Sequence, residues 1–359
     1  PEYVHCPWDK CLYYESDTLS LLDLAREANS EKLLISHGPP RQGHRDGIDL
    51  VSEGANVGNP ALTQAMRKGE YFFGAFGNIQ EAGGKAVNLT ASNRAYDGRP
   101  AYSPDGRYIA FARQVVPGYE ADRFRLALYD RKKGTIKVLT EGFDNWALAF
   151  RWAKDSRSIV FQAPDKGRFP LFRVAVDTGK ITRLPLPSAK AFDLAGDGRV
   201  ALTFDRIGQP TELYVADPKT ERGRRLTSLN QQVADQHDIR PAEELWLPGE
   251  GGKKVHTFIV KPHGFSPARR YPLIINVHGG PQYQWSDHFR GDWQVYPAAG
   301  YVLAFFNPHG SIGYGQAYTA AISKDWGGKV YRDVMKVTDA LEKLPYVDKK
   351  RVGAMGWSY

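Results

Sequence analysis

The sequence predicts two successive architectures: a series of repeated antiparallel β-sheets, followed by an α/β domain. Two observations predict them. Between about residues 90 and 230, a turn-and-strand pattern recurs at intervals typical of one small sheet. After residue 235, short apolar runs alternate with longer segments, as in parallel sheets that are covered by helices. A chain of 359 residues has room for both.

The repeat begins with a turn that starts with Asp and leads into a strand. Its first copy is Asp105-Gly106-Arg107-Tyr108-Ile109-Ala110-Phe111, and further copies start at Asp155 and Asp197, at offsets of 50 and 42 residues. A second layer of strands follows each copy and closes on Leu139, Leu184 and Leu226. A single meander cannot bury both faces, so several must stack around an axis. The sequence therefore predicts a partial β-propeller over residues 1–235, and a β-sandwich is the alternative.

The repeat is weaker toward the start of the chain. Leu89-Thr90 matches Leu139-Thr140 and suggests the end of another blade, and residues 19–24 show a faint version. We therefore expect the ring of blades within this chain to be incomplete.

The α/β part is expected over residues 236–359. Apolar strands are predicted at residues 255–260, 273–277 and 301–306, and a helix at residues 329–344. The apolar stripe of this helix consists of Val330, Val334, Val337, Leu341 and Leu344. Pro345 and Asp348 then turn the chain into another strand, residues 351–355, which leads to the candidate catalytic residues.

That strand runs into Gly356-Trp357-Ser358-Tyr359, four of the five positions of the G-x-S-x-G nucleophile elbow. The elbow exposes a serine hydroxyl on a tight turn between a strand and a helix. Gly-x-Ser alone is weak, because most such serines lie in ordinary turns. The preceding helix and apolar strand supply the context that the mechanism requires, so Ser358 is the predicted nucleophile.

A partner motif, His278-Gly279-Gly280-Pro281, follows the predicted strand at residues 273–277. Such a loop points backbone N–H groups at a developing oxyanion. We predict Gly280 and Tyr359 as the two backbone donors, with His278 and Gly279 shaping the loop. A turn that merely uses Gly-Gly is the alternative.

With these motifs, three others occur in order: Asn307-Pro308-His309-Gly310-Ser311-Ile312-Gly313-Tyr314-Gly315, Asp325-Trp326-Gly327-Gly328, and Val347-Asp348 with Arg351-Val352. Together they resemble the catalytic domain of the prolyl oligopeptidase family, in its acylaminoacyl-peptidase and dipeptidyl-peptidase 5 branch. The resemblance implies a propeller followed by an α/β-hydrolase domain. It also implies a serine peptidase that cleaves short peptides through an acyl-enzyme without a cofactor or metal.

Two features depart from a complete member of that family. Members usually carry Arg where this chain has His309, which removes a bidentate donor near the site. In an α/β-hydrolase the triad Asp and His follow the serine along the chain, whereas all nine histidines precede Ser358. We expect the triad Asp and His to lie outside this chain, and the polypeptide as printed to be inactive.

Other classes of function are disfavoured. The net charge of +8 comes from scattered basic residues, so no nucleic-acid partner is expected. Cys6 and Cys11 are the only cysteines, too few for a zinc site, and they form a local disulfide or remain free thiols. No apolar stretch is long enough for a membrane span. The glycines at residues 310–315 lack the Lys and Ser/Thr of a phosphate-binding loop.

An esterase on the same fold, or a propeller binding module with a degenerate hydrolase domain, are the alternatives to a peptidase. The Glu243-Glu244 pair at the domain junction is interpreted as solvated charge. Peptide specificity and oligomeric state are not indicated. Exported bacterial relatives favour a periplasmic or secreted location, although the sequence assigns no compartment.

Overall fold

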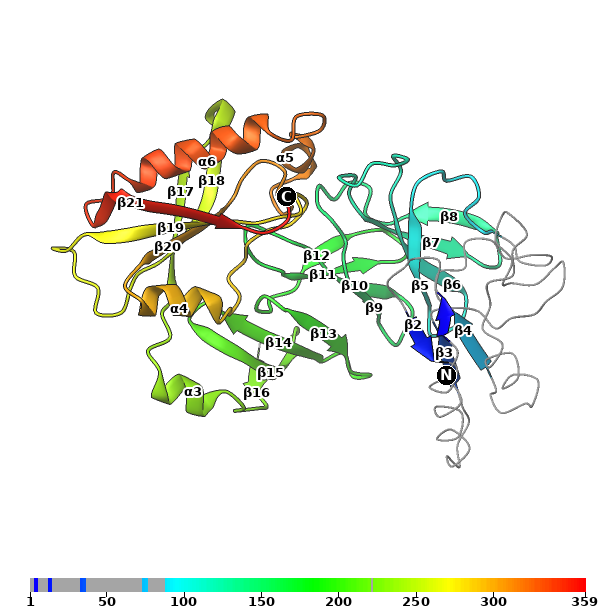
Figure 1. The fold of residues 1–359 in the computed structure, drawn as a ribbon. Helices are drawn as coiled ribbons and strands as arrows, with labels where there is room; N and C mark the ends of the chain where they lie inside the picture. Colours follow the sequence, from blue (N-terminus) through cyan, green and yellow to red (C-terminus); the bar gives the residue numbers. More distant parts are fainter. Residues whose placement is uncertain (1–2, 6–11, 15–32, 37–72, 77–87, 221) are drawn as a thin grey trace. The chain divides into compact units, whose positions relative to one another are not determined.

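The computed structural model describes residues 3–5, 12–14, 33–36, 73–76 and 88–359 except residue 221 (Figure 1). The chain divides into two compact units, residues 1–89 and 90–359. In the first unit, β1 (Tyr3–His5) pairs antiparallel with β2 (Leu12–Tyr14), and β3 (Leu33–Ser36) pairs parallel with β4 (Phe73–Phe76). Cys6, Cys11 and the faint repeat at residues 19–24 lie outside the described residues.

The second unit begins with three four-stranded antiparallel sheets. The first has the order β5 (Asp97–Tyr102), β6 (Tyr108–Arg113), β7 (Arg125–Asp130), β8 (Thr135–Val138). The second has the order β12 (Ile181–Arg183), β11 (Leu171–Ala175), β10 (Ser158–Gln162), β9 (Phe150–Trp152). The third has the order β13 (Ala191–Leu194), β14 (Val200–Arg206), β15 (Gln209–Asp217), β16 (Arg222–Arg225). Each is a meander of consecutive strands, as the repeat predicts.

The predicted repeat is also a repeat of hydrogen bonds. In each copy the Asp side chain accepts a bond from the backbone N–H two residues later, namely Arg107, Arg157 and Arg199, at 3.0, 2.9 and 3.0 Å. The residue between them has positive φ in each case: Gly106 (68°), Ser156 (59°) and Gly198 (90°). The closing leucines also share a bond, because the N–H groups of Leu139, Leu184 and Leu226 donate to the carbonyls of Leu126, Leu171 and Leu213.

Strand β10 shows how these sheets pack. Ile159 and Phe161 belong to the core shared with β5–β8, whereas Val160 belongs to the core shared with β13–β16. All three side chains are buried. Successive side chains of a strand point to opposite faces, so the middle sheet packs against one neighbour on each face.

The rest of the unit is a five-stranded mixed sheet with helices. Its strand order is β17 (Ala242–Pro248), β18 (Lys254–Val260), β20 (Val302–Asn307), β19 (Tyr271–Val277), β21 (Val347–Gly356). The helices are α3 (Gln231–Gln236), the 3₁₀ turn η1 (Glu250–Gly252), α4 (Asp292–Ala298), α5 (Gln316–Ala320) and α6 (Gly328–Leu341). Strands β19, β20 and β21 are parallel, as expected.

Two details differ from the sequence expectation. Strand β18 runs antiparallel to both β17 and β20. Only residues 249–253 join β17 to β18, and a parallel pair needs a crossover of a dozen or more residues. Helix α6 ends at Leu341 rather than at residue 344. Leu344 precedes Pro345, and a residue in that position is disfavoured in the helical conformation.

The mixed sheet has a core on each face. Along β20, Val302, Ala304 and Phe306 pack on the side of α6, whose Val337 and Leu341 are buried there. Leu303 and Phe305 face the other side and pack with Trp293 of α4. Figure 1 shows α6 and α4 on opposite faces of the sheet. Both faces of β20 are therefore dry, which explains its uninterrupted apolar sequence.

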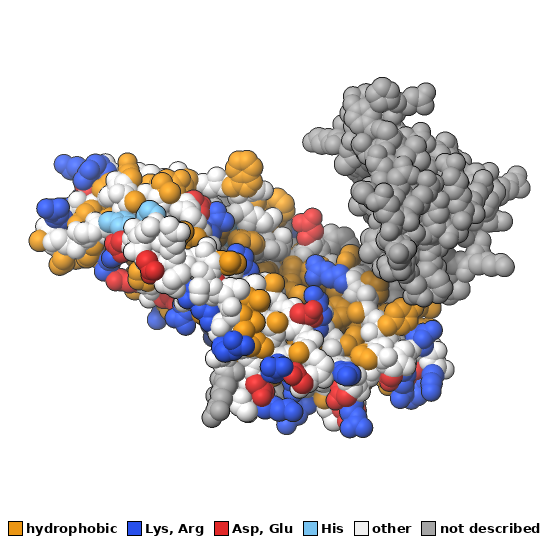
Figure 2. All heavy atoms as spheres, turned by 90° about the horizontal axis from the view of Figure 1, so that it is seen from below, with side chains coloured by type: hydrophobic (Ala, Val, Ile, Leu, Met, Phe, Trp, Pro, Cys, Tyr) orange, Lys and Arg blue, Asp and Glu red, His pale blue; other side chains and the backbone are white. Residues whose placement is uncertain are grey.

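The surface of the described part mixes charges. In Figure 2, Lys and Arg side chains are interspersed with Asp and Glu over the face in view. Within the described residues, no helix is sufficiently long and apolar to cross the membrane. The same residues contain no group of three or more His, Cys, Asp and Glu that is arranged to hold a metal ion.

Candidate active site

The turn after β21 has the backbone of a nucleophile elbow. Ser358 has a φ of 66°, a conformation that non-glycine residues seldom adopt and that is typical of strained functional positions. Strand β21 pairs with β19 up to Gly356 opposite Val277. A Cβ atom on Gly356 would lie 3.1 Å from the Val277 carbonyl oxygen, a tight contact that favours glycine here. The close approach brings the serine to the carboxyl end of the parallel strands.

The His278-Gly279-Gly280-Pro281 loop meets this elbow directly. A Cβ atom on Gly279 would lie 3.0 Å from Ser358 Cβ and 3.3 Å from the Tyr359 backbone nitrogen, and would clash with the Trp357 carbonyl oxygen. Gly280 has a φ of 132°, which excludes most side chains. The loop and the serine, which are about eighty residues apart in the sequence, therefore lie in contact, with the Tyr359 N–H group beside them.

His278 is a buried structural member of this loop. Its Nδ1 lies 2.8 Å from the Gly279 carbonyl oxygen, and its Nε2 lies 2.9 Å from Ser311 Oγ. Burial lowers the pKa of His278 from 6.5 to about 4, so the ring is neutral at pH 7. Because a carbonyl only accepts hydrogen bonds, the neutral ring carries its proton on Nδ1. The ring thus fixes the loop rather than serving as a base.

His309, at the position where the family resemblance predicts Arg, is buried against a carboxylate. Its Nδ1 lies 2.6 Å from Asp333 Oδ2, and Asp333 also accepts bonds from the backbone N–H groups of His309 and Glu250, each at 2.7 Å. The His309 ring stacks on Tyr318 with centroids 4.5 Å apart. A single imidazole N–H here supplies one side-chain bond to Asp333, where a guanidinium can supply two.

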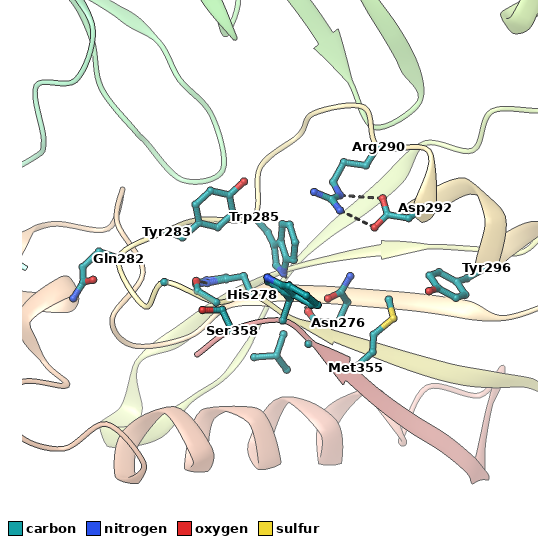
Figure 3. A pocket seen from close by; sticks show the side chains of 15 residues that line it. Asn276, His278, Gln282, Tyr283, Trp285, Arg290, Asp292, Tyr296, Met355 and Ser358 are labelled. Carbon is teal, nitrogen blue, oxygen red and sulfur yellow. Dashed lines mark hydrogen bonds and ion pairs between the residues drawn. The ribbon is translucent and has the colours of Figure 1, made fainter. Parts of the chain in front are cut away.

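Ser358 opens onto a pocket of about 720 Å³ (Figure 3). Its lining includes the oxyanion loop, Tyr283, Trp285, Tyr296 and Met355. At one side Arg290 donates to Asp292 at 2.7 and 3.0 Å and lies 5.1 Å above the Trp285 ring. An aromatic wall beside a paired charge is typical of a site for an organic ligand with a polar end. Sequence reasoning missed these lining residues, because no motif marks them.

No histidine within the described residues is hydrogen-bonded to Ser358. The Oγ atom of Ser358 has no hydrogen-bond partner among those residues. Five of the described histidines have other partners. These are His256 with Glu244 and Tyr314, His263 with Asp238, His278 with Ser311, His288 with Asp205, and His309 with Asp333.

Glu243 and Glu244 are both exposed, as the interpretation of solvated charge implies, but Glu244 also takes part in an ion-pair network. Its carboxylate is bonded to both Arg168 amino groups, and it also lies 3.0 Å from His256 Nε2. Burial alone would raise the pKa of Glu244, but the bonds and charge of Arg168 hold it below its usual value. Burial lowers the pKa of His256, whose ring stacks on Trp246 at 4.6 Å. Only the folded chain brings Arg168, 76 residues away, to this carboxylate.

Comparisons with known proteins give a consistent picture. Residues 287–359 match the model of the prolyl oligopeptidase family. Dipeptidyl-peptidase 5 of Porphyromonas gingivalis is 32% identical over 281 residues, covering 77% of this chain and 41% of the relative. Dipeptidyl-peptidase 5 of Schizosaccharomyces pombe is 29% identical over 280 residues, covering 72% and 38%. The chain thus spans about two fifths of the length of these relatives.

A solved structure supports the fold. The acylaminoacyl peptidase of Pyrococcus horikoshii superimposes with a TM-score of 0.62 at 20% identity, covering 71% of this chain and 40% of that one. At this level of identity the likeness concerns the architecture alone. It extends over more of the chain than the 73 residues that the family model matches.

Proposed function

Because the chain belongs to the prolyl oligopeptidase family, we propose that the full-length protein is a serine peptidase acting on short peptides. The observation that carries the proposal is the contact between the two motifs. Ser358, at a φ of 66°, lies against the backbone of Gly279. Nucleophile and oxyanion donors must meet in this way for acyl transfer.

In the proposed reaction, Ser358 Oγ attacks the carbonyl carbon of the scissile peptide bond and loses its proton to a histidine. The carbonyl oxygen becomes an oxyanion that accepts bonds from the N–H groups of Gly280 and Tyr359. Collapse of this intermediate breaks the C–N bond, and the histidine returns the proton to the leaving amine. Water then hydrolyses the ester on Ser358 by the same steps. We assign the histidine and its carboxylate partner to residues outside this chain.

The proposal includes the finer architecture. The three meanders β5–β8, β9–β12 and β13–β16 are proposed to be consecutive blades of a propeller, with residues 1–235 forming part of it and residues 236–359 the first part of an α/β-hydrolase domain. The repeated Asp turns and the packing of neighbouring sheets on both faces of β10 support this assignment. Such a propeller would restrict the site to short peptides.

The relatives of higher identity support one substrate class. Both relatives are dipeptidyl-peptidases by name, which favours release of dipeptides from a free N-terminus over release of N-acyl amino acids. The pocket wall of Tyr283, Tyr296 and Met355 would suit apolar side chains of such peptides.

Labelling with a fluorophosphonate probe tests the nucleophile. The full-length protein should react, whereas Ser358→Ala should not; Ser156→Ala, which changes another serine at positive φ, should react normally. Equal labelling of wild type and Ser358→Ala would overturn the assignment. Turnover of dipeptidyl, N-acyl-aminoacyl and simple ester substrates then separates the peptidase from an esterase. An intact fold without labelling would indicate a non-catalytic module.

A further inference from the structure

A turn of the β9–β12 sheet reaches the chain segment that follows the oxyanion loop. Strands β10 and β11 are joined through residues 165–168, where Asp165 and Arg168 exchange backbone bonds of 2.8 and 3.0 Å. The two central residues both have positive φ, 47° at Lys166 and 71° at Gly167. This is a tight two-residue hairpin turn of the kind whose twist matches that of the flanking strands. We refer to it as the 165–168 turn.

Gln284 connects this turn to the segment that follows the oxyanion loop. The Gln284 side chain is completely buried. Its Oε1 accepts a bond from the Gly167 N–H at 3.1 Å, and its Nε2 donates to the Arg168 carbonyl oxygen at 2.9 Å. The Asp287 N–H also donates to the Gly167 carbonyl oxygen at 2.9 Å. The carboxamide therefore uses both ends to bind the backbone of another sheet.

The fit on the side of the turn is tight. A Cβ atom on Gly167 would lie 2.7 Å from Phe258 Cζ and 3.0 Å from His256 Cε1. Lys166 N–H donates to the Gly313 carbonyl oxygen at 3.1 Å. Arg168 is bonded to Glu244, as described above. The 165–168 turn thus has a single fitted position against the mixed sheet.

The bonded segment is short and continuous with the oxyanion loop. A Cβ atom on Gly280 would lie 2.8 Å from the Gln282 nitrogen and 3.1 Å from Tyr283 Cβ, so the loop folds directly onto the residues before Gln284. On the other side of Gln284, the Asn307 side chain accepts from the Trp285 N–H at 2.7 Å and donates to its carbonyl at 2.9 Å. The segment is held from both sides.

From this geometry we infer that Gln284 is a positioning residue for the oxyanion loop, acting through the 165–168 turn. The inference rests on the proposed function and adds a residue to it. Gln284 does not touch the reacting atoms. It aligns the Gly280 N–H with the substrate oxyanion only while the β9–β12 sheet is seated on the mixed sheet. Catalytic competence would thereby depend on contact between the two sheets.

The first test is amide hydrogen exchange of residues 278–283 in the full-length protein. Gln284→Ala should exchange about tenfold faster there than wild type, since two buried bonds are lost. Gln316→Ala is the matched control. Its side chain likewise bonds residues of the antiparallel part of the chain, Ala121 in the β6–β7 connection and Trp146 in the β8–β9 connection, but not the segment that follows the oxyanion loop. Gln316→Ala should leave exchange at residues 278–283 unchanged.

The second test is kinetic. For Gln284→Ala, kcat should fall by about ten- to a hundredfold with KM within about twofold, because a misplaced donor affects the transition state. Affinity for a peptide aldehyde, whose adduct with Ser358 places an oxygen in the oxyanion site, should fall in proportion to kcat/KM. Gly167→Ala leaves Gln284 in place but presses a methyl group on Phe258 and His256 and so displaces the turn. It should give the same pattern, which covers the case in which Gln284→Ala does not fold.

The outcomes separate the two proposals. A full-length protein that neither labels nor turns over would overturn the proposed peptidase, while hydrogen exchange would still report whether Gln284 holds the loop. Unchanged exchange in Gln284→Ala and Gly167→Ala would overturn the inference whatever the activity. Faster exchange with unchanged kcat and aldehyde affinity would overturn the positioning role and leave only a structural contact.

Discussion

Two turns in the described part of the chain place a serine at positive φ, and they differ in what the strain does. Ser156 (φ 59°) lies in a repeat turn of the β9–β12 sheet, where the equivalent positions are Gly106 and Gly198. Ser358 (φ 66°) lies at the end of β21. At the first position glycine serves equally well in sister repeats, so the strain has only a structural consequence. At the second the side chain is the proposed nucleophile.

The sharpest test of this comparison is Ser358→Gly. It should lower turnover of the full-length protein by about 10⁶-fold, as loss of a serine nucleophile does. It should also raise the free energy of unfolding by about 1 kcal/mol, because glycine removes the backbone strain. Steady-state kinetics and urea denaturation measure the two effects. A stability below that of wild type would show that the elbow is unstrained.

Gly279→Ala and Gly106→Ala compare the glycines of the two regions. At Gly279 the new methyl group would press on Ser358 Cβ and the Tyr359 nitrogen, so kcat should fall about 100-fold. At Gly106, whose φ is 68°, the nearest atom is Arg131 Nη1 at 3.8 Å. That variant should lose about 1 kcal/mol of stability and keep its kcat. Similar kcat values for both variants would contradict the contact between loop and elbow.

The oxyanion loop should also make stability depend on pH, through His278. His278 has a folded-state pKa of about 4 against 6.5 when unfolded, so the unfolded state takes up the proton first. Its contribution to stability is present above pH 6.5 and is lost as the pH falls toward 4, by about 3 kcal/mol. Denaturation of wild type and His278→Gln across this range should show a steeper loss for wild type. Parallel curves would mean that His278 does not remain neutral when folded.

The smallest expected effects are at Ser156. Its Oγ accepts a bond from the Asp105 N–H at 3.0 Å and so links two sheets. Ser156→Ala loses this bond and keeps the strain, which should cost about 1 kcal/mol. Ser156→Gly loses the bond but relieves the strain, and should lie within about 0.5 kcal/mol of wild type. Denaturant midpoints decide the order; equal losses for both variants would mean that the strain at Ser156 is negligible.

Local patterns in the sequence predicted much of the fold. The Asp turns predicted the meanders, because the bond between an Asp side chain and the backbone two residues later, like a positive φ, involves only neighbouring residues. The apolar run at residues 302–306 indicated a strand buried on both faces. The antiparallel direction of β18 and the early end of α6 were missed, although short connections and proline effects are readable in principle.

The sequence by itself determined the residues of the candidate site: Ser358, His278, Gly279, Gly280 and Tyr359 stand in short motifs whose chemistry depends on residue type and spacing. Only the tertiary structure decided what surrounds them. The pairing of Arg168 with Glu244 and the two bonds of Gln284 join residues 76 and about 117 positions apart. Burial and partnership of this kind depend on how whole sheets pack, and no local pattern encodes that contact.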